Sequence, residues 1–539
     1  MSNRIYNVLF HTHTVSGLVI SVALYVIFFA GSISFFRDDI IAWERNQPIK
    51  AQTQMKADFD RILDTLAMRY GDLRGRTINI RQPHQERNVA VTIEPSQDTS
   101  ATESVRRSVY TYLDTKTYEE GTYYSTYTLG EFIYRLHFFA QIPYPYGYLL
   151  SGFVAFFFLF AIVTGLIIHW KKIVSNFYLF RPWAKLKTVW TDAHTALGFI
   201  GLPFQFIFSV TGAVLIIGTT IMLGPASSLI YNNDRDLMYR ELLDQPLPPA
   251  FANHPVDFDQ SLNELVKRAQ SSWNDAVLGR LCIQNYGDES MKILVEARPQ
   301  TRGALLGLGR ATFDKSGVLI DQTDEESINY IVGVDQMMRR LHFGDFGGYG
   351  LKIIYFVFGI ITCFVILSGV LLWVEARDRR STVPWKRNAN QWVASIFVAI
   401  SLSMYPSIAL LFSMVRLVHD AGDLAPHVFI YSMFFTSWLI LSIGFAICRN
   451  NYLTSKYCLL LGSILGFAIP VVNGMVTGNW MWYTYNVQQL QIFVVDAFWF
   501  ITSLISLLVF LRLKTRQPDP LLEKEAPGEV RELVEASAF

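Results

Sequence analysis

The chain has 539 residues, of which 51% are hydrophobic and only 17% are charged, whereas about 25% charged residues are usual in soluble domains. The formal net charge is +1 and no long basic tract is present, so nothing indicates a nucleic-acid partner. Apolar runs long enough to cross a bilayer recur along the chain, and the sequence therefore predicts an α-helical polytopic membrane protein.

Eight apolar stretches are each long enough for a helix to cross a hydrocarbon layer of about 30 Å. The first stretch runs into Arg37, Asp38 and Asp39 rather than a cleavage site, so we interpret it as a retained span and not as a signal peptide. The predicted spans cover residues 14–36, 147–169, 196–222, 352–374, 391–415, 427–448, 457–477 and 490–511.

Lysines and arginines are concentrated in every second loop between the predicted spans. Five lysines and arginines lie between spans two and three, five more lie between spans four and five, and others follow spans six and eight. Short loops of this kind stay in the cytoplasm. We therefore expect both termini, including a tail over 516–539, on the cytoplasmic side, and two long insertions, 37–135 and 223–345, on the opposite side.

The two insertions have the same order of predicted elements. In each, an amphipathic helix, at 55–70 or 261–273, precedes three strand-like runs and a turn. The runs are 77–80, 89–93 and 108–113 in the first copy, and 278–284, 291–297 and 310–313 in the second. Two copies of a small α+β domain are the simplest interpretation.

The pattern of spans one and two recurs in spans three and four, with the same residue type at equivalent positions. The equivalent pairs are His13 and His194, Gly31 and Gly212, Gly165 and Gly369, and His137 and His342. Each of the first two glycines lies 18 residues after its histidine. A duplicated four-helix core (1–36, 136–222 and 346–380) should have a pseudo-twofold axis along the membrane normal. Spans five to eight, within 381–515, do not repeat the pattern.

His137 should not belong to the span that follows it. Pro143, Pro145 and Gly147 separate the two, so we expect this histidine on a short segment at the membrane face.

The chain combines the His-x-x-x-Gly starts of spans one and three at His13 and His194, the Leu-His pairs at 136–137 and 341–342, the Thr/Ser-Gly ends of spans two and four at 164–165 and 368–369, and the paired insertions. In these features it resembles the PepSY-associated transmembrane helix family over about residues 5–380. The resemblance implies two PepSY-like periplasmic domains inserted in the core, and a place in the bacterial inner membrane. Members of this family include siderophore-iron reductases that carry b-type haem. The sequence has no C-x-x-C-H motif, so any haem would be held without a covalent bond.

Eight of the ten histidines lie at predicted membrane boundaries. The predicted symmetry sets His13 opposite His194 on the cytoplasmic side, and His137 opposite His342 on the outer side. Facing imidazoles from the helices of a bundle can hold haem iron, so we expect these four to bind two haem b groups. His169 is either a further ligand on the cytoplasmic side or an interfacial residue.

The other polar and aromatic residues near the membrane boundaries have simpler possible roles, beside possible roles in binding haem or chelate. Histidine at an interface is often only amphipathic, which is our interpretation of His11, His419 and His427. Arg135, Arg339 and Arg340 could pair with haem propionates. Most tyrosines and tryptophans of the outer face suit an interfacial belt, although some could line a docking site for a bulky ferric chelate.

We therefore expect a haem-dependent ferric reductase that releases Fe(II) from a periplasmic siderophore or other ferric chelate. No nucleotide-binding loop is found, so membrane quinol or a separate cytoplasmic flavoprotein would supply the electrons. The alternatives are a non-redox periplasmic binding or regulatory protein, or a transporter. Asp496, the acid inside a predicted span, could handle protons or join two helices.

Overall fold

The computed structural model describes residues 2–47, 57–82, 87–172, 181, 183–243, 246–273, 276–299, 306–324, 326–378, 381–418 and 424–513. Within these ranges eight helices are long and apolar enough to cross a membrane, as predicted. They are α1 (Asn3–Ser34), α5 (Tyr146–His169), a continuous helix Leu186–Leu229, α12 (Gly348–Arg377), α13 (Pro384–Val418), α14 (Pro426–Cys448), α15 (Asn451–Thr477) and α17 (Leu490–Arg512). The chain is thus a multi-pass membrane protein.

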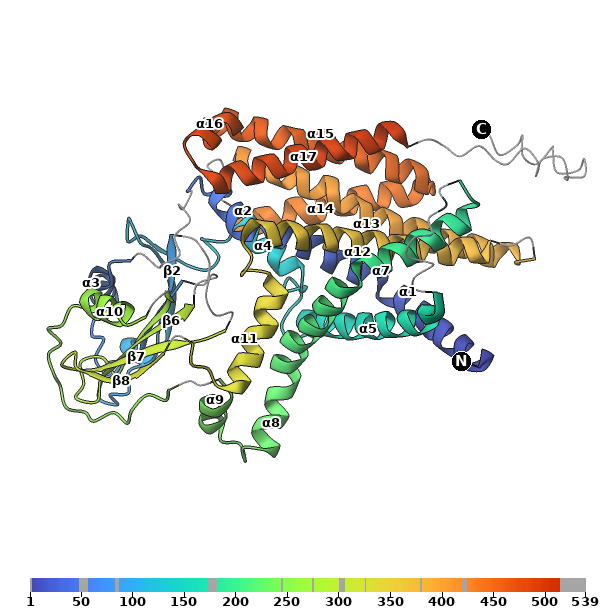
Figure 1. Ribbon diagram of the computed structural model, residues 1–539. Helices are drawn as coiled ribbons and strands as arrows, with labels where there is room; N and C mark the ends of the chain where they lie inside the picture. Colours follow the sequence, from blue (N-terminus) through green and yellow to red (C-terminus); the bar gives the residue numbers. More distant parts are fainter. Residues whose placement is uncertain are drawn as a thin grey trace, which may run out of the picture.

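The spans form one bundle with an extended sheet at one end (Figure 1). We call this end the sheet end and the other the far end; the start of α1 and the last turn of α17 lie at the far end (Figure 1). In the first half of the bundle, α1 and α7 each contact α5 and α12. In the second half, α13 contacts α14 and α15, and α17 contacts α15. Contacts of α12 with α13 join the halves.

The third span is longer than its sequence pattern predicts. Helix α7 (Leu186–Ala213) passes through Pro203 and continues as a π-helix, Val214–Met222, and as α8 (Leu223–Leu229). At about 1.5 Å per residue these 44 residues measure about 66 Å, more than a hydrocarbon layer requires. The extra length supports α11 (Tyr330–Phe343), which packs along α7 and the π-helix.

Two short helices lie at the sheet end of the bundle. Helix α2 (Arg37–Glu44) follows α1, and α4 (Leu129–Leu136) precedes the second span and contacts both α1 and α2. His137 ends α4, whereas α5 begins only at Tyr146. The predicted break between this histidine and the second span is therefore confirmed.

The two insertions share a single eight-stranded antiparallel sheet. The first supplies β1 (Ile78–Arg81), β2 (Asn88–Ile93), β3 (Val109–Asp114) and β4 (Glu120–Gly121); the second supplies β5 (Ala276–Gln284), β6 (Lys292–Pro299), β7 (Gly309–Asp314) and β8 (Leu319–Thr323). The strand order is β4-β3-β2-β1-β5-β6-β7-β8. The equivalent strands β1 and β5 pair at the centre, with Ile78 opposite Ile283. The sequence predicts the two sets of strands but not that they join.

The helices on this sheet are also paired. α3 (Phe59–Tyr70) and α10 (Leu262–Ser271) each begin at a side-chain cap, Asp58 and Ser261, and the two helices contact each other. One hydrophobic core includes side chains of both insertions. In the part of the chain that the structure describes, the remaining short helices are α9 (Arg235–Leu243), α16 (Met481–Asn486) and the 3-10 turns Glu103–Arg106 and Trp170–Lys172. The two insertions therefore form one body, which we call the sheet body, with internal twofold character.

Candidate functional site

The first histidine pair lies at the sheet end of the bundle. The rings of His137, which ends α4, and His342, near the end of α11, have centroids 5.8 Å apart and planes inclined by 42°. His137 Nδ1 donates to the Ile27 carbonyl at 2.6 Å. His342 Nδ1 lies 2.8 Å from the Thr211 hydroxyl, which itself donates to the Ile207 carbonyl at 2.6 Å and so accepts from the ring. In both rings Nε2 is left with the lone pair.

Burial keeps the rings of this pair neutral. It lowers the pKa of His137, and it lowers the pKa of His342 to about 3 with a further contribution from the nearby His137. Neutral imidazole is the form that binds metal. At neutral pH both rings are therefore ready to act as ligands.

The second pair lies toward the far end. The rings of His13 on α1 and His194 on α7 have centroids 6.1 Å apart and planes inclined by 75°. Their Nδ1 atoms lie 2.9 Å from the carbonyl oxygens of Ala161 on α5 and Val365 on α12 respectively. These two carbonyls occupy matching positions in the repeat, four residues before Gly165 and Gly369. The symmetry predicted from the sequence therefore extends to the hydrogen bonds that orient the rings.

The ring separation leaves room for one metal ion in each pair. A metal-bound imidazole nitrogen lies about 2 Å from a first-row metal and the ring centroid roughly 1 Å behind it, so two rings on one ion have centroids about 6 Å apart. The observed 5.8 and 6.1 Å agree with this value. Among the described residues, no group of three or more His, Cys, Asp or Glu side chains could hold an ion. Two imidazoles supply two ligands, and in haem the other ligands of the iron come from the macrocycle, so a haem in each pair remains a prediction.

Each imidazole packs against a glycine of the repeat. A Cβ atom added at Gly31 would lie 2.5 Å from His137 Nδ1, and one at Gly165 or Gly369 would lie 3.0 Å from Cε1 of His13 or His194 respectively. At Gly212 the contact with His342 Cε1 would be an ordinary 3.6 Å. A side chain at Gly31 would therefore displace its ring, whereas at Gly165 and Gly369 the ring would have to move by only a few tenths of an ångström. The sequence shows these glycines as repeat markers but gives no sign of which ring each one contacts.

The arginines near the first pair already have carboxylate partners. Glu131 on α4 binds Arg37 and accepts from Arg135 Nε at 2.6 Å. Arg339 pairs with Asp335 at 2.8 Å on the exposed face of α11. The interaction of Arg135, Arg339 and Arg340 with propionates remains a prediction, and Arg135 and Arg339 would have to share or exchange their carboxylate partners.

The other described histidines belong to neither pair, although His169 lies close enough to His194 for the two rings to interact electrostatically. The His169 ring lies edge-on to Phe199, with centroids 6.4 Å apart, and its role as a ligand stays a prediction. His11 is exposed, and His427 packs against Tyr124 with centroids 4.7 Å apart. His419 and His84 lie outside the described residues.

A buried polar network joins the second half of the bundle to α2. Asp496 on α17 accepts from Trp43 Nε1 and from Asn473 Nδ2, both at 2.8 Å, and none of the three side chains is exposed. Arg416 on α13 donates to the Trp43 and Glu44 carbonyls and lies 4.2 Å over the Trp43 ring. The network fits the helix-joining role of Asp496. Neither Trp43 nor Arg416 carries a sequence signal for it.

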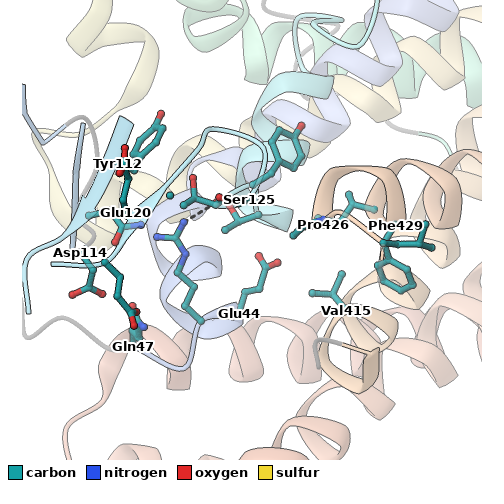
Figure 2. Close-up of a pocket in the computed structure, with 18 of the residues that line it drawn as sticks. Glu44, Gln47, Tyr112, Asp114, Glu120, Ser125, Val415, Pro426 and Phe429 are labelled. Carbon is teal, nitrogen blue, oxygen red and sulfur yellow. Dashed lines mark hydrogen bonds between the residues drawn. The ribbon is translucent and has the colours of Figure 1, made fainter. Parts of the chain in front are cut away.

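A cavity of about 490 Å³ opens at the sheet end, beside α4. Its lining comes from α2, the β3–β4 region, the segment before α4, and the ends of α13 and α14 (Figure 2). Tyr127, one of the predicted outer-face aromatics, lines it together with Tyr112, and a docking role for these aromatics remains a prediction. The contribution of α13 and α14 could not be predicted, because spans five to eight follow no recognised pattern.

Comparison with known proteins identifies the core. The family model of the PepSY-associated TM region matches residues 10–376, which include all four paired histidines and end before α13. A protein of Pseudomonas aeruginosa, Uncharacterized protein PA4219, is 24% identical over 243 residues, which is 41% of this chain and 57% of that protein. This chain thus spans only a little more than half of that relative's length. Because the family model matches well over half of the chain, the protein belongs to the family of the PepSY-associated TM region.

Proposed function

We propose that this protein is a haem b-containing reductase of the bacterial inner membrane, which transfers electrons from the cytoplasmic side to ferric iron held by a siderophore or another ferric chelate in the periplasm. The observation that carries the proposal is the presence of two imidazole pairs, with centroids 6.1 and 5.8 Å apart, at two levels of one four-helix core. All four rings are oriented through Nδ1, which leaves Nε2 for iron.

Each pair would hold one haem b, His13 with His194 and His137 with His342. Bound haem b supplies a one-electron carrier whose potential depends on its axial ligands and on the apolar protein around it. The chain contributes the ligands, the hydrogen bonds that fix their tautomer, and the glycines that give the rings space. Its arginine and tyrosine side chains at the sheet end supply a polar boundary to this apolar interior.

The two pairs lie at different depths of the bundle, one toward each end. On α1, His13 and Ile27, the partner of His137, are 14 residues apart, which corresponds to about 21 Å along the helix. Next to Ile27, Phe28 packs edge-on against Phe158 and Phe208, with centroids 5.2 and 6.1 Å apart, and Phe208 lies on α7 between His194 and Thr211. Apolar packing of this kind excludes water from the space between the pairs.

The direction of transfer follows from the proposed topology. Basic loops favour a cytoplasmic far end with both termini, which sets the sheet and His342 in the periplasm. Electrons would enter from membrane quinol or a cytoplasmic flavoprotein. In the periplasm Fe(III) gains one electron and becomes Fe(II), whose lower charge weakens its bonds to hard oxygen ligands, so the metal leaves the chelate.

Single-turnover kinetics test this function. The purified protein is reduced without oxygen, mixed with a ferric trihydroxamate chelate, and followed by the haem α-band and by trapping of Fe(II) with a colorimetric chelator. We expect matched loss of reduced haem and gain of Fe(II), and we expect His342→Ala to lose the fast phase while His254→Ala, a surface control, retains it. A protein without haem, or unchanged kinetics in His342→Ala, would refute the proposal. A binding protein without redox activity would then be the better account.

A further inference from the structure

The cavity beside α4 has two chemically different walls. Carboxylates and hydroxyls of the sheet region form one wall, which includes Asp114, Glu119 and Glu120. Apolar side chains at the sheet ends of α13 and α14 form the other, which includes Val415 and Phe429 (Figure 2). Because the second wall lies beyond residue 376, the cavity is not built from the family core alone.

Several groups of the polar wall are held in place by contacts outside the cavity. Glu44 accepts from the Leu129 amide at 2.6 Å, which fixes it at the start of α4. Asp114 accepts from Arg87 Nε at 3.1 Å, and Glu120 binds Tyr70 and lies 3.5 Å from Arg69. Pre-set groups of this kind favour binding, because little side-chain freedom remains to be lost.

The charge of the lining is mostly negative. Among the described lining residues are four carboxylates and one basic side chain, Arg45, which donates to the Thr126 carbonyl at 2.8 Å. Glu119 is exposed, accepts from the Thr117 hydroxyl at 3.3 Å, and has no ion-pair partner among the described residues. Because Asp114 and Glu120 are paired with Arg87 and Arg69, the charge that a ligand meets is chiefly that of Glu119, which would repel an anionic ligand and favour a cationic or hydrogen-bond-donating one.

Helix α4 has one end at the cavity and the other end at the first histidine pair. Thr128, which caps α4, lines the cavity, and His137 ends the same helix. The eight residues of α4 span about 12 Å, so a molecule in the cavity lies one short helix away from this imidazole.

We propose that this cavity binds the ferric chelate, and that it selects chelates which are neutral or cationic and have one apolar face. This inference rests on the proposed function and adds to it the location and the charge class of the substrate. The carboxylate wall faces the polar, donor-rich side of the chelate. The apolar wall of α13 and α14 covers the other side, which gives spans five to eight a part in substrate binding.

Binding of a redox-inactive mimic tests the inference independently of electron transfer. The probes are the Ga(III) complex of a linear trihydroxamate with a free ammonium group and the same complex with that amine succinylated, which makes it anionic. Their affinities for the purified full-length protein are measured by calorimetry. We expect the succinylated complex to bind about tenfold more weakly.

Two variants and their controls locate the binding. Glu119→Gln keeps the size of the side chain and its hydrogen bond but removes the charge, and Leu424→Trp fills the mouth of the cavity at a position that is 62% exposed. Glu103→Gln and Leu417→Trp are the matched controls, since both positions are exposed and neither lines the cavity. We expect weaker binding of the cationic complex in the first two variants and wild-type binding in the controls, with the haem spectrum unchanged in all four.

The results separate the two proposals. Equal affinity for both complexes, or wild-type binding in Glu119→Gln and Leu424→Trp, would overturn the inference even if the protein contains haem and reduces iron. Charge-selective binding that depends on these two residues, in a protein that has no haem, would support the cavity site and refute the reductase.

Discussion

Replacement of Gly31 by alanine tests the packing of the first histidine pair. The new Cβ would lie 2.5 Å from His137 Nδ1 and 2.7 Å from Cε1, whereas ordinary contacts begin near 3.4 Å. The imidazole must therefore shift by about 1 Å, away from the Ile27 carbonyl that it binds at 2.6 Å. Forced overpacking costs about 1–3 kcal/mol, which exceeds the roughly 1 kcal/mol that alanine gains over glycine in a helix.

The same helix offers a matched control. A Cβ at Gly17 meets nothing within 4 Å, so Gly17→Ala keeps the site and has only the helix-propensity gain. We expect Gly31→Ala to lose the haem held by His137 and His342, or to show a changed spectrum for it, while Gly17→Ala retains both haems. Gly212→Ala, with its 3.6 Å contact to His342, should be close to wild type.

The assay is haem content per polypeptide together with the reduced α-band of each purified variant. If Gly31→Ala has the wild-type haem content and spectrum, the close approach of glycine and imidazole is irrelevant to ligation, and our account of the first pair is wrong.

Three further predictions concern stability and pH. Asp496→Leu leaves the buried donors of Trp43 and Asn473 without an acceptor and should destabilise the bundle by about 2–5 kcal/mol; a thermal midpoint equal to wild type would contradict this. Asp60→Ala removes the acceptor of the first amide of α10, at 2.6 Å, and should cost about 1–2 kcal/mol, measured as faster proteolysis of the sheet body; unchanged proteolysis would exclude a capping role. In protein made without haem, the folded pKa of His342, about 3, lies below the unfolded value of about 6.5, so the unfolded state binds more protons and stability falls as the pH drops below 6.5. His342→Gln should flatten this dependence, and an identical slope in the two proteins would argue against a buried neutral ring.

The sequence predicts the parts of this fold that rest on local patterns. Apolar length gave all eight spans, and period-two runs gave six of the eight strands within a few residues of their bounds. The strands that it missed, β4 and β8, are short or exposed and have little hydrophobic alternation. The joining of β1 to β5 depends on contacts between residues about 200 positions apart, which no local pattern specifies.

The site was predictable as far as the duplication extends. Symmetry alone paired His13 with His194 and His137 with His342, and the ring distances agree with this pairing. The hydrogen-bond partners of the imidazole rings could not be predicted, because backbone carbonyls such as that of Ile27 have no sequence signature. One departure from symmetry shows the limit: His342 binds the Thr211 hydroxyl, whereas the matching position in the first half is Ala30, and His137 uses a carbonyl instead.

The second half of the bundle had no repeat to guide prediction. Asp496 was noted as an acid within a span, but its partner Trp43 lies on α2, more than 450 positions away. The cavity wall formed by α13 and α14 depends on the same long-range packing, and only the fold brings it beside the sheet.

Haem content of the purified wild-type protein, determined as the pyridine haemochrome per polypeptide after expression with ample haem, tests the central claim most directly. We predict two haem b groups per chain with the low-spin spectrum of bis-histidine ligation, and one in His342→Ala. A wild-type chain without haem would contradict the account.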